Sequence, residues 1–238
     1  KYVENYEVKL GWRSLYCGLF TLRLGGVMYY FLDNEYYFNR SQVYGEFDDG
    51  ERVAFFSMAV LETIRHIHHN FPTDILHCND WHTALAPVFL REFYNQDPLF
   101  KDIKTVFTIH NLKFQGQYSK TMVGDVLGLA GTPADGQMNH EEAVNFLQGA
   151  VIYSDAVTTV SPTSAQEICT PAYGEQLDGL FESRSYKLFG IINGINRGDY
   201  DPSTDKAIAV NYDASSVEKK IENKSAFKCN KLFKIADY

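Results

Sequence analysis

Polar side chains gather where two short apolar runs of the chain end. His110 and Asn111 follow one such run, and Asp80 and His82 follow the run before it. Runs of β-branched and aromatic residues suit strands that are buried on both faces of a parallel sheet. Ligands bind outside the carboxyl ends of such strands, so these four residues are candidates for chemistry rather than for packing.

Two further apolar runs end in the same way. Ser161 follows residues 156–160 and precedes Pro162, which is typical of a helix that begins with a serine cap and a proline. Asn193 follows residues 188–192. Amide and imidazole groups donate and accept hydrogen bonds, as sugar hydroxyls do. Together, the hydroxyl, amide, imidazole and carboxylate groups predict recognition of a polyol such as a sugar.

Each candidate also has a purely structural explanation. Asp80 could cap the helix that follows it, His82 could pack at the start of that helix, and Asn193 could serve a turn. His110 at the mouth of a buried strand is harder to explain by stability, which favours a functional role. A metal site would also need His77, which lies inside a strand whose side chains alternate in direction, so no metal is expected.

The composition is that of a globular α/β protein. The 238 residues are 45% hydrophobic and 15% aromatic, which is enough to bury a large core. The net charge of −8 argues against a nucleic-acid partner, and no apolar run reaches the about 18 residues of a membrane span. The four cysteines form no Cys-x-x-Cys pair and no nucleotide-binding glycine fingerprint is present, so no cofactor is expected.

Strands and helices alternate along the predicted domain. The apolar spacing and turn signals predict a hairpin over 15–32, an aromatic loop over 35–47 that packs on the sheet or offers stacking faces to a sugar, helices over 48–69, 83–94 and 140–152, and strands over 74–78, 104–109, 156–160 and 188–192. Right-handed β-α units place their strand ends on one edge of the sheet. Residues 1–200 are therefore predicted to form one Rossmann-like α/β domain with a parallel sheet and flanking helices.

The remaining residues have a different character. Residues 201–205 are turn-rich, which predicts a linker. The charged helix predicted over 213–235 has too few apolar positions to hold a core of its own. Residues 201–238 are therefore expected to lead into, or dock on, another domain.

Five motifs follow one another along the chain. They are Tyr-Phe-Leu-Asp-Asn-Glu-Tyr-Tyr-Phe at 30–38, His-Cys-Asn-Asp-Trp-His-Thr at 77–83, Thr-Ile-His-Asn-Leu at 108–112 with Gln-Gly at 115–116, Thr-Val-Ser-Pro-Thr at 159–163, and Gly-Ile-Ile-Asn-Gly-Ile at 190–195. In this order and spacing they resemble the bacterial glycogen synthase and plastid starch synthase family. The resemblance runs along nearly the whole chain.

The resemblance implies a fold, a reaction and partners. The chain is expected to be the N-terminal, acceptor-side half of a two-domain glycosyltransferase of the GT-B architecture. The family transfers glucose from ADP-glucose to the non-reducing end of an α-1,4-glucan with retention of configuration. The implied partners are ADP-glucose, the glucan and the C-terminal domain of the same chain. The implied location is the bacterial cytoplasm or a plastid.

Motif matching also implies residue roles. His110 would contact the transferred glucose near the reacting centre, and Asp80 would lie in the catalytic crevice beside it. The residues implied to bind substrate are Asn111, Asn193, His82 and Gln115. No role is carried over to Ser161, which has only a structural match.

The sequence also departs from the family pattern. The family's first strand and its Lys-x-Gly-Gly donor loop have no match, so the first β-α unit is expected to be missing. The Arg, Lys and Glu of the C-terminal domain are absent too. Asn196 stands where Asp is expected, Gln176 where Gly is usual and Tyr200 where Trp is common.

These departures bear on activity. Departure of ADP builds negative charge that fixed cations must stabilise, and the strand-end residues include no Arg or Lys. The 238-residue chain is therefore predicted to be inactive alone and the full chain active. The alternative hypothesis is a non-catalytic α-glucan-binding module that kept the acceptor groove and lost the donor half.

Overall fold

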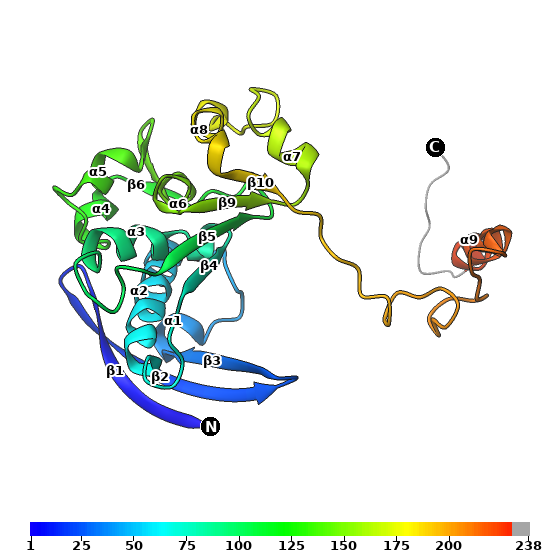
Figure 1. The fold of residues 1–238 in the computed structure, drawn as a ribbon, viewed down its shortest axis with the longest axis horizontal. Coiled ribbons are helices and arrows are strands. Elements are labelled where there is room, and N and C mark those ends of the chain that lie inside the picture. Colours follow the sequence, from blue (N-terminus) through cyan, green and yellow to red (C-terminus); the bar gives the residue numbers. More distant parts are fainter. Residues whose placement is uncertain (230–238) are drawn as a thin grey trace. The chain divides into compact units, whose positions relative to one another are not determined.

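The computed structural model describes residues 1–229. Contacts divide the chain into two units, residues 1–192 and 193–238, and each is described by itself. Within residues 1–192, three β-sheets carry the helices that pack on them (Figure 1).

A four-stranded parallel sheet forms the centre of the first unit. Its strands lie in the order β10-β9-β5-β4. Their bounds are β4 Ile75–Asn79, β5 Lys104–Ile109, β9 Ala156–Thr159 and β10 Leu188–Gly190. Phe107 and Val157 face each other in register across β5 and β9, and both are buried, as expected for strands covered on both faces. The predicted α/β fold with a parallel sheet is therefore confirmed.

The first unit also contains α-helices and 3₁₀ turns. They are α1 (Glu35–Phe38), α2 (Asp49–Ile67), η1 (Trp81–Thr83), α3 (Leu85–Phe93), α4 (Thr121–Asp125), α5 (Pro133–Gln137), α6 (Phe146–Tyr153), α7 (Pro162–Glu167), α8 (Asp178–Ser183) and η2 (Ser185–Lys187), where η marks a 3₁₀ turn. Helix α3 packs between α2 and α6 (Figure 1). As predicted, Ser161 caps α7: its hydroxyl accepts from the backbone N–H of Ser164 at 2.9 Å.

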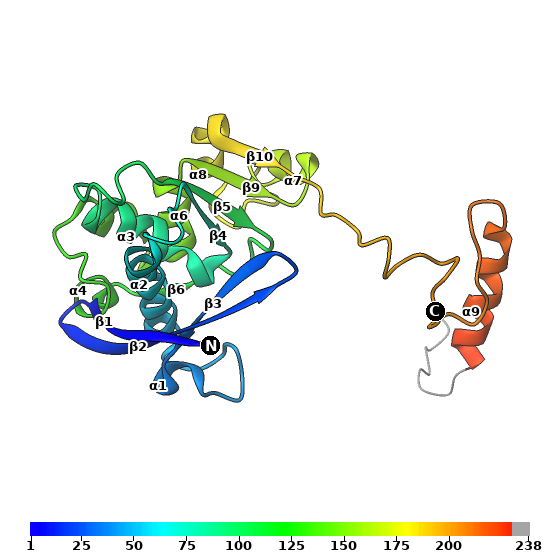
Figure 2. The same cartoon turned by 60° about the horizontal axis from the view of Figure 1, so that its bottom comes forward.

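A second, antiparallel sheet contains the predicted hairpin. Its strands are β1 (Tyr2–Leu10), β2 (Arg13–Leu24) and β3 (Val27–Asp33), in that order. The hairpin β2–β3 turns at Gly25-Gly26 as expected, and Figure 2 shows it projecting from the body of the unit. Strand β1 was not expected, although its inward-facing Tyr6 binds α2 by donating to the carbonyl oxygen of Ala59 at 3.2 Å.

The helix predicted over 140–152 is wrong in its first half. Residues 139–145 form the short strands β7 (Asn139–His140) and β8 (Ala143–Asn145), which join β6 (Gln117–Ser119) in a third sheet of order β6-β8-β7. Helix α6 begins only at Phe146, because the Asn145 side chain caps it by accepting from the backbone N–H of Gln148 at 2.9 Å. Strand pairing and this cap outweigh the helical spacing.

The aromatic segment 35–47 is not wholly a loop. Its first residues form α1, because Asn34 caps that turn by accepting from the backbone N–H of Tyr37 at 3.1 Å. Tyr37 is buried and stacks on Phe55 of α2 at 4.8 Å between ring centroids. Packing thus explains the start of the segment, while Tyr44 near its end is exposed.

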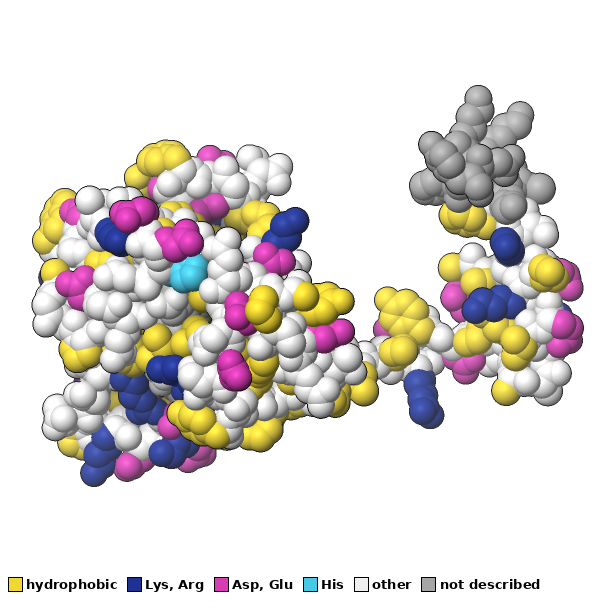
Figure 3. Space-filling model, turned by 90° about the horizontal axis from the view of Figure 1, so that it is seen from above, with side chains coloured by type: hydrophobic (Ala, Val, Ile, Leu, Met, Phe, Trp, Pro, Cys, Tyr) yellow, Lys and Arg dark blue, Asp and Glu magenta, His cyan; other side chains and the backbone are white. Residues whose placement is uncertain are grey.

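The second unit contains η3 (Val217–Lys219) and α9 (Lys220–Cys229). The helix predicted over 213–235 therefore starts later than expected, and its last residues lie outside the described part. Among residues 1–229, no helix has the length and apolar character needed to span a membrane. On the face in Figure 3, most basic side chains of the first unit gather at the lower left, with acidic side chains among them, and acidic side chains are spread over the rest of the unit.

Candidate active site

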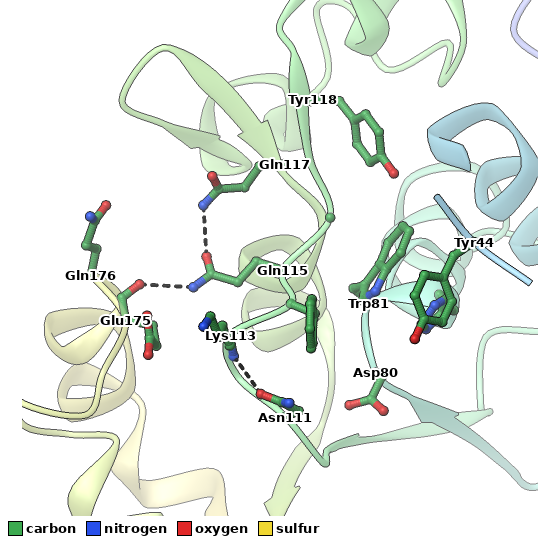
Figure 4. A pocket seen from close by; sticks show the side chains of 13 residues that line it. Tyr44, Asp80, Trp81, Asn111, Lys113, Gln115, Gln117, Tyr118, Glu175 and Gln176 are labelled. Carbon is green, nitrogen blue, oxygen red and sulfur yellow. Dashed lines mark hydrogen bonds between the residues drawn. The ribbon is translucent and has the colours of Figure 1, made fainter. Parts of the chain in front are cut away.

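A pocket of about 750 Å³ opens beyond the carboxyl ends of β4 and β5 (Figure 4). It is lined by Tyr44, Asp80, Trp81, His82, Asn111, Lys113, Phe114, Gln115, Gly116, Gln117, Tyr118, Glu175 and Gln176. The walls combine aromatic faces with amides and carboxylates. This mixture and this volume are typical of sites for small ligands.

The structure brings together four of the residues singled out by the sequence. Asp80, His82, Asn111 and Gln115 all line the pocket. His110 is not part of the lining but is bonded to Asp80 at the end of β5. The remaining candidate, Asn193, belongs to the second unit, and its proposed contact with sugar stays a prediction.

Asp80 has a strained backbone. Its φ of 56° and ψ of 178° lie in a region that is almost reserved for glycine, at a cost of about 1–3 kcal/mol. The backbone N–H of Asp80 donates to the carbonyl oxygen of Thr108 at 2.9 Å, and its carboxylate accepts from the backbone N–H of His110 at 2.8 Å. It makes no side-chain cap to η1, so the capping explanation is wrong. Asp80 instead binds the end of the neighbouring strand.

The imidazole of His110 is exposed and held from one side. Its Nε2 lies 3.0 Å from Oδ1 of Asn79, the last residue of β4. The neighbouring His77 bonds to the Thr108 hydroxyl at 2.7 Å and does not line the pocket. Among residues 1–229, no group of three or more His, Cys, Asp and Glu side chains could hold a metal ion.

His82 is a half-buried member of the pocket wall. Its ring lies against Trp81 at 4.2 Å and faces Tyr44 at 5.8 Å between centroids. Burial lowers the pKa of His82, an effect that the carboxylates of Asp80 and Asp49 partly offset. Its buried Nε2 has no hydrogen-bond partner among the described residues. This burial favours the neutral form of the imidazole.

Gln115 is buried, and its amide is already engaged. Its Nε2 donates to the carbonyl oxygen of Glu175 at 3.0 Å, and its Oε1 accepts from Gln117 at 3.0 Å (Figure 4). The same Oε1 also accepts from Asn145 at 2.5 Å. Through its hydrogen bond to Glu175, Gln115 holds the loop that carries Glu175 and Gln176 against the pocket. That loop has left-handed backbone, with φ of 46° and 69° at these two residues.

The sequence did not single out several wall residues. Lys113 places a cation in the pocket, where the strand-end residues alone offered none. Tyr44 offers an exposed aromatic face, a role that was one of the two predicted for its segment. Burial raises the pKa of Tyr118, with a further contribution from Asp49, so its hydroxyl stays protonated. Glu175 carried no local signal, because it reaches the pocket only through the fold.

Known proteins resemble this chain along its length. The family described as starch synthase catalytic domain matches residues 1–183. Glycogen synthase of Clostridium novyi is 48% identical over 223 residues, which is 93% of this chain and 46% of that protein. Glycogen synthase of Desulforamulus reducens is 47% identical over 226 residues, which is 94% of this chain and 46% of that protein.

A solved structure is similar as well. It is the catalytic domain of starch synthase IV from Arabidopsis thaliana, bound to ADP and acarbose. The two structures superpose with a TM-score of 0.80 at 29% sequence identity, and the match covers 100% of this chain and 49% of the starch synthase IV chain. This chain thus spans about half the length of the curated relatives it matches. The fold is that of a GT-B glycosyltransferase domain. With the parallel sheet and the pocket at its edge, these likenesses show that the chain belongs to the starch synthase catalytic domain family.

Proposed function

We propose that this chain is the acceptor-side half of a glycogen or starch synthase. The full protein transfers glucose from ADP-glucose to the non-reducing end of an α-1,4-glucan with retention of configuration. The observation that carries the proposal is the pocket that joins Asp80, His82 and Asn111 at the ends of β4 and β5. The relatives named glycogen synthase and the solved starch synthase IV bound to ADP and acarbose support it. The bacterial origin of the curated relatives favours the bacterial cytoplasm over a plastid.

The pocket residues have distinct roles in this proposal. His110 contacts the transferred glucose, and Asp80 fixes the backbone of His110 through the 2.8 Å hydrogen bond. Asn111 and His82 bind hydroxyl groups, and the motif match implies a sugar contact for Asn193. Trp81 is almost fully buried, so it supports the neighbouring ring of His82 rather than offering a large face to the sugar.

Departure of ADP sets the requirement for the rest of the protein. Negative charge develops on the β-phosphate, and removing one preorganised group that stabilises such charge costs about 2.7–4 kcal/mol of barrier. Lys113 is the cation that lines this pocket among the described residues. We expect further cations to come from a C-terminal domain of the same chain. The 238-residue chain should therefore be inactive alone.

A second candidate is a non-catalytic α-glucan-binding module. The exposed ring of Tyr44 in the pocket wall favours it, since aromatic faces bind sugars without any catalytic group. In that case the full-length protein binds maltooligosaccharides and transfers nothing.

Glucose incorporation into glycogen separates the two candidates. The full-length protein is assayed with ADP-glucose and with UDP-glucose, as wild type and as His110→Ala, and residues 1–238 are assayed alone. The same change at the exposed His69 is the matched control. A synthase prefers ADP-glucose, loses several orders of magnitude in His110→Ala and keeps its rate in His69→Ala. Absence of transfer from either donor, with maltooligosaccharide binding intact, would establish the binding module instead.

A further inference from the structure

Asn79 holds the ring of His110 at the edge of the sheet. It ends β4 and pairs in register with Thr108 of β5, two residues before His110. Its side-chain Oδ1 lies 3.0 Å from Nε2 of His110. Neither the motif roles nor the pocket lining assigns a function to Asn79.

The chemistry of the two groups fixes where the proton lies. An amide oxygen only accepts hydrogen bonds, so Nε2 of His110 must carry the proton and donate it. In the neutral ring, Nδ1 then keeps its lone pair and is the nitrogen that can accept from a hydroxyl group. We infer that Asn79 is a positioning residue that sets the Nε2–H tautomer and the ring plane of His110. This inference rests on the proposed function, in which His110 contacts the transferred glucose.

The strained backbone of Asp80 makes this arrangement possible. Successive side chains of a regular strand point to opposite faces, so Asn79 and Asp80 should not reach the same residue. The positive φ of Asp80 breaks the alternation, and both side chains bind His110. Asp80 holds the backbone N–H of His110, while Asn79 holds its ring. The strained backbone of Asp80 therefore lets two successive side chains hold the same histidine.

Asn79 is itself held in place. Its backbone N–H donates to the hydroxyl of Thr83 at 2.6 Å, and that hydroxyl donates to the carbonyl oxygen of Asn79 at 2.9 Å. Thr83 thereby closes η1 onto the end of β4. The side chain of Asn79 remains exposed at the surface, so replacing it removes a hydrogen bond without opening a cavity.

The test reads the tautomer directly. The full-length protein is labelled with ¹⁵N-histidine, and the ring signals of His110 are identified by their loss in His110→Gln. The wild type should show a protonated Nε2 and an unprotonated Nδ1. Asn79→Ala should shift this pattern toward a mixture of tautomers, while Asn79→Asp, which keeps an acceptor oxygen, should restore it. Asn95→Ala, at an exposed asparagine after α3, is the control.

Kinetics of the same variants connect the tautomer to the reaction. Asn79→Ala should lower kcat about tenfold, the worth of one hydrogen bond, with KM for glycogen unchanged, and Asn79→Asp should recover most of it. A protonated Nδ1 in the wild type, or unchanged ring signals in Asn79→Ala, would overturn the inference. If the expected tautomer shift occurs in a protein that transfers no glucose, the proposed function fails and the role of Asn79 in orienting the ring stands.

Discussion

The carboxylate of Asp80 accepts a hydrogen bond from the backbone N–H of His110 at 2.8 Å, although Asp80 has a φ of 56°. The two residues directly follow the neighbouring strands β4 and β5 and lie 30 positions apart in the sequence. A charge-assisted hydrogen bond of about 1.5–3 kcal/mol offsets backbone strain of about 1–3 kcal/mol. The net effect on the free energy of folding is therefore small. The result of the arrangement is that the backbone of His110 is held in a fixed position.

Replacing Asp80 separates strain from function. Asp80→Gly removes both the strain and the hydrogen bond, so the free energy of unfolding in urea should stay within about 1 kcal/mol of the wild type. Glucosyl transfer by the full-length protein should nevertheless fall about 100-fold or more. Asp80→Asn keeps the acceptor oxygen and the strained backbone, so its activity should lie between those of the wild type and Asp80→Gly. A fully active Asp80→Gly would show that the position of His110 is set by other contacts.

Gly116 tests the packing of the pocket wall. A Cβ at this position would lie 2.7 Å from Cε3 of Trp81, so Gly116→Ala should displace that ring and weaken maltooligosaccharide binding. Gly131→Ala is the matched control, because Gly131 has a similar φ, 79° against 66°, and no heavy atom within 4 Å of its Cβ position. The difference in unfolding free energy between the two variants should be about 1–3 kcal/mol. Equal effects would mean that backbone strain alone is responsible.

His82 should make stability depend on pH. Its pKa in the folded state lies below the ordinary value of 6.5, chiefly because of burial, so the unfolded state binds the proton more readily. Protonation therefore favours unfolding, and stability should fall as the pH drops below about 6.5. Urea unfolding at pH 7 and pH 5 should show a smaller loss for His82→Gln than for the wild type. His69→Gln, at an exposed histidine, controls for the removal of a histidine. An equal loss of unfolding free energy between pH 7 and pH 5 in the wild type and in His82→Gln would contradict the role of His82.

Gln176 occupies a position that suits glycine. Its φ of 69° is left-handed, which costs a residue with a Cβ about 1–2 kcal/mol. Gln176→Gly should therefore raise the free energy of unfolding by about 1 kcal/mol, seen as a higher urea midpoint. Gln42→Gly, in an exposed loop without positive φ, should bring no gain. A destabilised Gln176→Gly would show that the glutamine side chain makes a compensating contribution.

Lys187 should be important for stability without taking part in the pocket. Its buried ammonium donates to the carbonyl oxygens of Ile152 and Ser154, at 3.0 and 2.6 Å, at the C-terminal end of α6. Lys187→Met should leave these carbonyls without their donor and cost about 1–3 kcal/mol, measured by urea unfolding. Lys101→Met, at an exposed lysine, should change stability by less than about 0.5 kcal/mol. Similar values for the two variants would contradict the proposed contribution.

The sequence predicts the sheet better than the pocket. Apolar runs identify all four strands of the parallel sheet. The central β5 and β9 bury most of their residues, as such runs predict, whereas the edge strands β4 and β10 are largely exposed or partly buried. Strand β1 was missed, although its buried Tyr6, Val8 and Leu10 alternate with exposed residues in the period of two that is typical of a strand with one buried face. The helix predicted from His140 failed because pairing with β6 overrides local spacing.

Pocket residues that come from distant segments are harder to find. Tyr44 and Glu175 meet at one cavity only because the sheet brings their loops to the same edge, and no spacing rule connects them. Gln115 was found, but the three hydrogen bonds that occupy its amide depend on Glu175, Gln117 and Asn145. Residue type indicates which chemistry is available, whereas the fold decides which polar atoms remain free.

The turn at Gly25-Gly26 is a suitable site for an insertion or a label. No heavy atom lies within 4 Å of a Cβ built on either glycine, and the hairpin projects away from the body of the unit (Figure 2). Added residues there would extend into open space, since exposed loop tips tolerate insertion. A reporter peptide or fluorescent label placed at this tip should therefore leave the packing of the unit unchanged.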